Sequence, residues 1–361
     1  MDYKYFNIFL FSTFSLFLYC AYILISIDPY TIIDLSISYK NNIFSRSLIG
    51  SLLQIISHEL NINFVLLSSV LLISATALSF ALFIKYLAEL SFSKAAILFI
   101  LLTPFSYAFF LNNFSYVILR RDIFLILIIQ IFALLIRKVE SFRVGLLIFI
   151  IANLIGLFIH IMSVFIVLPV TSLLFIRHHN ISFWHLLSTW LFCLGGFVYL
   201  TFISSDPYFF VDQSLLKYGI NQADYERIIL ELGNQNTSNL LTELKIFIIN
   251  LPSFLVAITF LCTTFFVLIV PNTQFDFKDY LYFGFFSILL LIAHDHGRFF
   301  SIFFITFFYL YAENIKKDIS LSKNLLASLI LLFSIFFSMP HYFGLDIIQE
   351  SFFSFIIGIN I

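Results

Sequence analysis

Charged residues are scarce in this sequence. Asp, Glu, Lys and Arg make up 11% of its 361 residues, hydrophobic residues make up 61%, and the mean hydropathy is +1.04. A water-soluble domain carries roughly 25% charged residues, because its surface needs polar cover. The composition therefore excludes an ordinary soluble domain and predicts a chain that lies almost entirely within a lipid bilayer.

Several signals of soluble functions are also missing. The formal net charge is −1, so there is no basic excess to neutralise the phosphates of a nucleic acid. The three cysteines, Cys20, Cys193 and Cys262, each lie inside an apolar run, without the spacing of a disulfide framework or a metal site. No P-loop or dinucleotide-binding fingerprint is present. We expect no nucleic-acid partner, no nucleotide and no metal.

Long apolar runs dominate what is there. A transmembrane helix needs about 20 apolar residues, and we predict an all-α polytopic membrane protein with about eleven spans, within a range of ten to twelve. The uninterrupted run 144–176 must fold back near His160, and the first span is expected to stay uncleaved. The predicted spans form a single integral membrane domain over 1–361: 6–27, 62–84, 95–112, 116–136, 144–160, 162–176, 183–203, 246–270, 280–294, 299–312 and 324–339.

The distribution of Lys and Arg among the short loops predicts the orientation. Placing the N-terminus in the cytoplasm puts more Lys and Arg on the cytoplasmic side, as membrane proteins prefer. The longest polar stretch, 204–245, then lies outside as a periplasmic loop, in which Asn221 can cap a short helix that Gly233 ends.

Four polar clusters fall on the same predicted outer side, and the first opens an amphipathic segment that runs to Leu60. Its polar stripe consists of Arg46, Gly50, Gln54 and His58, which lie four residues apart. This pattern predicts a helix that lies in the membrane interface. Arg46 then contacts either lipid phosphate nonspecifically or the phosphate of a substrate.

The second cluster is Arg120-Arg121-Asp122 at the outer start of a span. Arginine presents a planar fork that binds phosphate through two hydrogen bonds. Asp122 can hold one of the two arginines in place. An internal salt bridge and a phosphate site both remain open for this cluster.

The third cluster is His160, alone at the turn between two apolar halves. A histidine in this position is either a hydrogen-bonded core residue or a general base, for which its ordinary pKa near about 6.5 is well suited.

The fourth cluster is the run His294-Asp295-His296-Gly297-Arg298 between two spans. On a helical turn His294 and Arg298 share a face, and Asp295 lies within reach of Arg298. Gly297 allows close approach of a ligand to the backbone. The alternatives are a self-paired turn and a metal site, although no further ligands follow with a suitable spacing.

Together these clusters predict chemistry on an anionic, lipid-linked substrate at the outer leaflet. Arginines would stabilise a diphosphate leaving group while a histidine or carboxylate takes a proton from an acceptor hydroxyl, and the reaction needs no cofactor. The substrate-binding candidates are Arg46, Arg120, Arg121, His294 and Arg298, and the catalytic candidates are His160, Asp295 and His296. Asp28, Asp34 and Asp206 could add carboxylates.

With about eleven spans, one late outer loop, and the motifs Phe-Ser-Arg46-Ser-Leu-Ile-Gly50, Arg120-Arg121-Asp122 and Asp295-His-Gly-Arg298, the chain resembles the Wzy-type polymerases of bacterial O-antigen and capsule. The resemblance implies an inner-membrane enzyme. It would transfer a growing glycan from undecaprenyl diphosphate to a new lipid-linked oligosaccharide repeat unit, alone or with a chain-length regulator. The long loop carries a single arginine, Arg227, where some members have several.

Other functions remain open. A flippase or transporter would place its polar residues deep inside the membrane, whereas these lie near one face. A sugar O-acetyltransferase would need a path for an acyl donor. An O-antigen ligase would share nearly all of these features, and a noncatalytic scaffold would need none of them.

Overall fold

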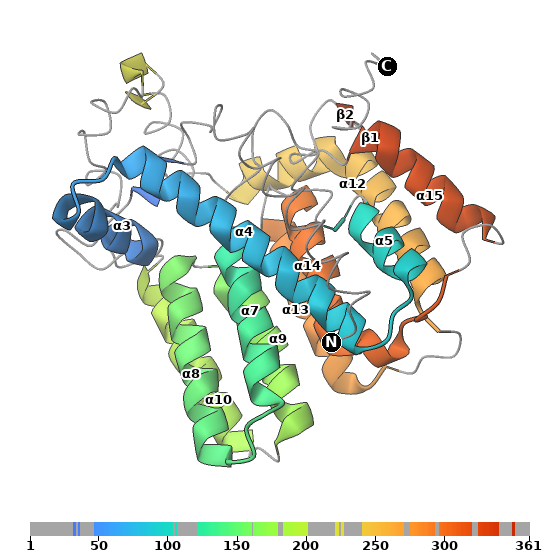
Figure 1. The fold of residues 1–361 in the computed structure, drawn as a ribbon, viewed down its shortest axis with the longest axis horizontal. Coiled ribbons are helices and arrows are strands. Elements are labelled where there is room, and N and C mark those ends of the chain that lie inside the picture. The colour runs from blue at the N-terminus through green and yellow to red at the C-terminus, as the bar shows by residue number, and fades with distance from the viewer. Residues whose placement is uncertain are drawn as a thin grey trace. The chain divides into compact units, whose positions relative to one another are not determined.

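The structure is a computed structural model, and its described part is helical almost throughout (Figure 1). This confirms the predicted all-α class. The described residues also include two strands of two residues each, β1 (Phe337–Ser338) and β2 (Gln349–Glu350), which pair antiparallel. The described residues are 32–33, 35–36, 47–103, 105–106, 121–160, 162–179, 183–200, 221–223, 225–226, 240–270, 275–292, 296–319, 324–338 and 349–350.

Contacts divide the chain into two compact units. Unit 1 comprises Met1–Phe9, Phe80–Ile118 and Leu240–Ile361, and unit 2 comprises Leu10–Ser79 and Leu119–Asn239. The helices of unit 2 are α3 (Ser47–Glu59), α7 (Asp122–Ile136), α8 (Phe142–Ile159), α9 (Ser163–His178) and α10 (Phe183–Val198). Those of unit 1 are α5 (Lys94–Leu102), α12 (Leu240–Leu268), α13 (Phe277–Ile292), α14 (His296–Tyr311) and α15 (Leu325–Phe336). Helix α4 (Phe64–Glu89) begins in unit 2 and ends in unit 1.

Most of the predicted spans correspond to a helix in the described residues. The run 144–176 folds back at His160, as expected, to give α8 and α9. Helix α12 already begins at Leu240, inside the range expected for the outer loop. Among the described residues, α4 and α8 are long and apolar enough to cross a membrane, and several shorter apolar helices accompany them. The expected first span 6–27 lies outside the described residues.

In unit 2, helices α7, α8 and α9 pack against one another, and α10 packs against α8 and α9. Their connections are short, so neighbouring helices run antiparallel (Figure 1). Gly156 allows α8 to approach α9 closely, because a Cβ there would lie 3.3 Å from the Cβ of Ser163. Small residues have this role wherever helix backbones pack closely.

The polar side chains of this bundle bond to one another or to the backbone. Asn153 Nδ2 on α8 donates to Thr171 Oγ1 on α9 at 3.1 Å and to its own helix at Phe149 O at 2.8 Å. Trp190 Nε1 on α10 donates to Ser172 Oγ on α9 at 3.0 Å. These interhelical bonds link α8 to α9 and α9 to α10.

The outward face of α8 has the opposite character. Val144, Leu147, Ile151 and Ile155 form a stripe at helical spacing, and each is at least 40% exposed. The inward face of the same helix carries Asn153. Helix α8 therefore buries the amide of Asn153 and exposes its aliphatic side chains.

Helix α3 confirms that the segment after the first predicted span is helical, and its two faces are now defined. Gly50 is buried and Gln54 is half-buried, with Gln54 Nε2 donating to Ser36 O at 2.8 Å. Ile55 and Leu60 are 59% and 63% exposed. Gly50 and Gln54 therefore face their own unit together with the buried Ile49 and Leu53, whereas His58, also on the polar stripe, is exposed.

Unit 1 is packed largely by aromatic rings. Phe286 on α13 stacks on Phe303 of α14 with ring centroids 4.2 Å apart, and Tyr86 on α4 stacks on Tyr309 of α14 at 4.4 Å. The Phe-rich composition of the sequence thus has a structural use, since offset aromatic stacking adds to the burial of apolar area.

One end of unit 1 gathers three chain connections. Ser93 N–H donates to Lys317 O at 2.7 Å, and Lys316 N–H donates to Leu268 O at 2.7 Å. Helix α13 begins beside them with a reciprocal cap, in which Asp279 N–H donates to Asp276 Oδ1 at 3.0 Å and Asp276 N–H donates to Asp279 Oδ2 at 2.8 Å. Tyr311 O–H also donates to Asp279 Oδ1 at 2.8 Å. The lysines that flank these connections, Lys85, Lys94, Lys316 and Lys317, are called the lysine end below.

Candidate functional site

The first residue of α7, Asp122, is a buried carboxylate. Its side chain is 1% exposed, and Arg121, which caps the helix, is 3% exposed. An acidic residue in the first turn is stabilised by the partial positive charge of a helix N-terminus. Two opposite charges are thus brought into the apolar end of the bundle by adjacent residues of the chain.

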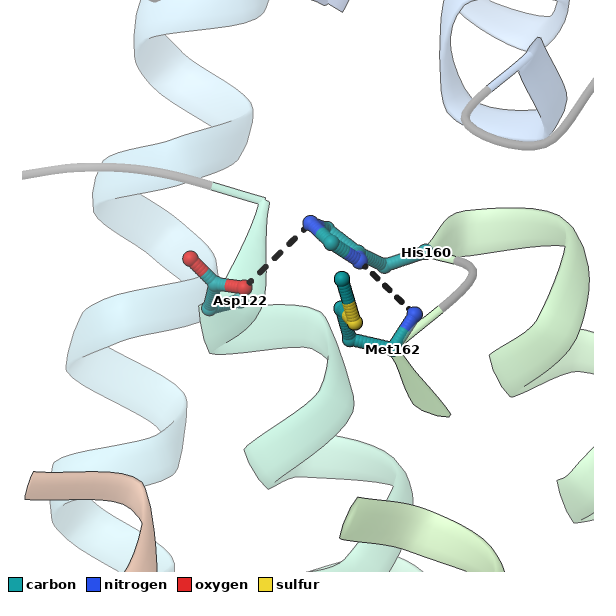
Figure 2. Close-up of polar contacts among 3 residues, drawn as sticks. All are labelled: Asp122, His160 and Met162. Carbon is teal, nitrogen blue, oxygen red and sulfur yellow. Dashed lines mark hydrogen bonds and ion pairs between the residues drawn. The ribbon is translucent and has the colours of Figure 1, made fainter. Parts of the chain in front are cut away.

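His160 reaches the same place from the turn between α8 and α9. It caps α8 with an extended backbone, which ends the helix, and its N–H donates to Gly156 O at 2.9 Å. Its side chain is 6% exposed, and its Nε2 lies 4.0 Å from Asp122 Oδ1 (Figure 2). The structure therefore pairs a residue from the start of α7 with one from the end of α8.

The other ring nitrogen of His160 has a defined partner. Met162 N–H donates to His160 Nδ1 at 3.1 Å. In the neutral imidazole one nitrogen accepts and the other donates, so this bond assigns the proton to Nε2, the atom that faces Asp122. As Figure 2 shows, one ring nitrogen faces the carboxylate and the other faces Met162 N. We refer to Arg121, Asp122 and His160 as the site end of the bundle.

This arrangement favours two chemical roles. A carboxylate in a desolvated position can accept a proton from a substrate hydroxyl, and an imidazole nitrogen 4.0 Å away, beyond direct hydrogen-bond distance, can orient it through electrostatic attraction. A buried arginine supplies positive charge at the end where an anion would be bound. Polar and ionisable groups in such apolar surroundings are functional candidates, because their burial is costly.

No protein-family model matches this chain, and no curated protein or solved structure matches it either. Its function must therefore be argued from the site itself.

The remaining predicted site residues are distributed differently. Arg46, Arg120, His294 and Asp295 lie outside the described residues. His296 and Arg298 lie in the first turn of α14, which belongs to unit 1, whereas Arg121 and His160 belong to unit 2. Within the described part of the chain, no group of three His, Cys, Asp or Glu side chains is placed to hold a metal ion.

Sequence reasoning had placed Asp122 beside Arg121 and had not paired it with His160. The two residues are far apart in the chain, and each is a local feature of its own helix end. The signal that links them is the antiparallel order of α7, α8 and α9, because the start of one helix then lies beside the end of the next. The sequence predicts both residues on the outer side, which is consistent with a common helix end.

Proposed function

We propose that the chain is a polytopic membrane protein that transfers a glycan from a lipid-diphosphate carrier. The membrane part of this proposal is supported by the inverted surface of unit 2. The exposed stripe on α8 is wholly aliphatic, and on α4 Leu66, Val70 and Leu78 are exposed along one face that also carries Ser74. A surface of Leu, Ile and Val side chains that encloses hydrogen-bonded amides is stable in a lipid bilayer, because lipid solvates apolar side chains and polar groups must be satisfied within the protein.

The charges at the two ends of the bundle support the proposed orientation. Arg137, Arg143 and Arg177 lie at the end opposite to Asp122 and His160, since α7, α8 and α9 are antiparallel neighbours. With the arginine-rich end in the cytoplasm, as the preference of membrane proteins requires, the buried site lies at the outer face. An outer-face site is where a flipped lipid-linked glycan would be presented.

The single observation that carries the catalytic proposal is the buried group of Arg121, Asp122 and His160 at one helix end (Figure 2). In the proposed reaction an acceptor hydroxyl attacks the anomeric carbon of the donor glycan. The bond from that carbon to the diphosphate oxygen breaks, and the lipid diphosphate leaves with the electron pair. Asp122 takes the hydroxyl proton, and Arg121 stabilises the charge that develops on the diphosphate.

In this proposal Asp122, rather than His160, accepts the proton. His160 Nδ1 is already an acceptor for Met162 N–H, so in the neutral ring Nε2 carries a hydrogen and has no lone pair for a substrate proton. His160 is therefore a positioning residue that acts through Asp122. The burial of both side chains also keeps out water, which would otherwise compete with the acceptor hydroxyl.

The acceptor that best fits the resemblance to Wzy-type polymerases is a further lipid-linked repeat unit. The experiment that tests this is a gel of surface glycan from the source organism after deletion of the gene and after its return on a plasmid. A polymerase deletion leaves core lipid that carries a single repeat unit, because export and ligation continue. Loss of every unit would instead indicate a ligase or flippase, and an unchanged ladder would overturn the glycan proposal.

A further inference from the structure

The end of the α7–α10 bundle opposite the site carries five basic side chains, which we call the arginine end. Arg137 caps the last turn of α7, and Arg143 lies in the first turn of α8. Arg177 and His178 lie in the last turn of α9. The five members, Arg137, Lys138, Arg143, Arg177 and His178, are all exposed.

These residues share one small region. Partial desolvation lowers the pKa of His178 below its ordinary value, and repulsion by Arg137, His179 and Arg177 lowers it further. The charge of Arg137 at the end of α7 therefore acts on the imidazole of His178 at the end of α9. Phe142 at the start of α8 and His185 at the start of α10 also meet here, with ring centroids 5.7 Å apart. The ends of α7, α8 and α9 thus present cations to a single surface beside the start of α10, with Glu140 as the acidic residue in the α7–α8 turn.

The arginine end and the lysine end differ in their main basic residue. The arginine end has three arginines, whereas the lysine end of unit 1 has Lys85, Lys94, Lys316 and Lys317. Both kinds of residue satisfy the charge preference of cytoplasmic loops. Arginine adds a planar fork that forms two parallel hydrogen bonds with one phosphate, which lysine does not offer.

We propose that the arginine end binds the phosphodiester headgroup of anionic phospholipids in the cytoplasmic leaflet. The inference rests on the proposed membrane embedding. Clusters of basic side chains next to a membrane surface attract anionic lipid, and the outward aliphatic stripe of α8 gives the acyl chains of such a lipid a surface to lie against. Arg143 and Val144, at the start of that stripe, are both exposed.

The chain has a natural reporter at this place. It contains two tryptophans, Trp184 and Trp190. Trp184 lies at the start of α10 beside His185 and is 73% exposed, whereas Trp190 is half-buried against Ser172. In a W190F background the fluorescence of Trp184 alone reports which lipids lie next to the arginine end.

The test reconstitutes the W190F protein in phosphatidylcholine vesicles in which part of the lipid is replaced by dibrominated phosphatidylglycerol or dibrominated phosphatidylcholine. Bromine quenches tryptophan on contact. We expect phosphatidylglycerol to associate about fivefold more strongly than phosphatidylcholine, from the attraction of about one well-placed basic residue. Changing Arg137, Arg143 and Arg177 to Gln together should abolish the preference. The matched control changes Lys85, Lys94 and Lys317 to Gln and should keep it.

The outcomes separate the two proposals. Absence of quenching by either lipid would overturn the membrane embedding itself. Equal quenching by both lipids, an equal loss in the lysine variant, or a preference that inorganic phosphate removes would overturn only the lipid site. If the triple arginine variant fails to insert into the membrane, the single variant R143Q tests the lipid site instead, because loss of one exposed charge rarely affects folding. R143Q must lower the preference for phosphatidylglycerol over phosphatidylcholine more than K317Q does.

Discussion

Arg121 is 3% exposed at one end of α7, whereas Arg137 is exposed at the other end. The same contrast holds for the histidines, since His160 is buried between α8 and α9 and His178 is exposed where α9 ends. The two ends thus use the same residue types in opposite surroundings. Charge at the exposed end costs little and can set orientation, whereas charge at the buried end is retained against its desolvation cost and therefore calls for a function.

The largest expected effect is on activity at the buried end. D122N removes the proposed proton acceptor with almost no change in shape, and we expect polysaccharide formation to fall about 100-fold or more, the usual share of a general base. Complementation of the deletion strain, read on a glycan gel, measures this. The matched control is D279N, which changes another buried aspartate at a helix start in unit 1 and should leave the ladder intact. Equal activity of D122N and the unaltered protein would remove Asp122 from the mechanism.

Stability should distinguish the two ends next. R121Q withdraws a buried positive charge from the surroundings of the Asp122 carboxylate, and we expect the free energy of unfolding to fall by about 2 kcal/mol. R137Q changes an exposed residue of the same helix and should alter it by less than about 0.5 kcal/mol. Thermal unfolding of both purified variants in detergent gives the comparison. Similar losses of unfolding free energy in R121Q and R137Q would mean that the difference in burial between the two arginines does not affect their contributions to stability.

The role of His160 can be resolved by two substitutions that each keep one of its ring nitrogens. Gln retains an N–H near the position of Nε2, and Asn retains an acceptor near the position of Nδ1. Because His160 is proposed to act on Asp122 through Nε2–H, H160Q should keep about tenfold more activity than H160N. Equal loss in both, with normal membrane insertion, would indicate that His160 is itself the base.

The smallest effect is expected from pH at the exposed end. The pKa of His178 is lowered in the folded protein, so the unfolded chain binds the proton first as the pH falls. The free energy of unfolding should therefore decrease on acidification through the ordinary histidine value near about 6.5. H178Q should remove part of this slope in melting curves between about pH 7.5 and pH 5.5. An unchanged slope would contradict the assignment.

Patterns local in sequence predicted the helices well. The continuous run 144–176 was too long for one span, and the structure turns it at His160. The amphipathic stripe of α3 was also visible, because four-residue spacing places Gly50 and Gln54 on one face. The inward orientation of Gln54 could not be predicted, since it depends on Ser36, which meets Gln54 only after the chain has folded.

Two residues of the candidate site, Arg121 and His160, were among the predicted site residues, whereas Asp122 was predicted only to hold an arginine in place. Arg121 and His160 stood out as polar residues in apolar runs, but the carboxylate that faces His160 comes from a different helix. The tautomer of His160 depends on a backbone N–H two residues along the chain, in a turn whose geometry the sequence does not specify. The difference between arginine and lysine ends is likewise set by which helix ends meet.

The tight turn at His160 also bears on how such a protein would be made. Helices α8 and α9 are joined by three residues, so they would enter the bilayer together as a helical hairpin with the turn as its leading tip. That tip carries its own hydrogen bonds, because His160 N–H bonds to Gly156 O, His160 O accepts from Ser163 N–H, and the ring accepts from Met162 N–H. Few bare polar groups then have to cross the hydrocarbon. The contacts that fix the imidazole would thus also make its delivery to the far side of the membrane easier during biosynthesis.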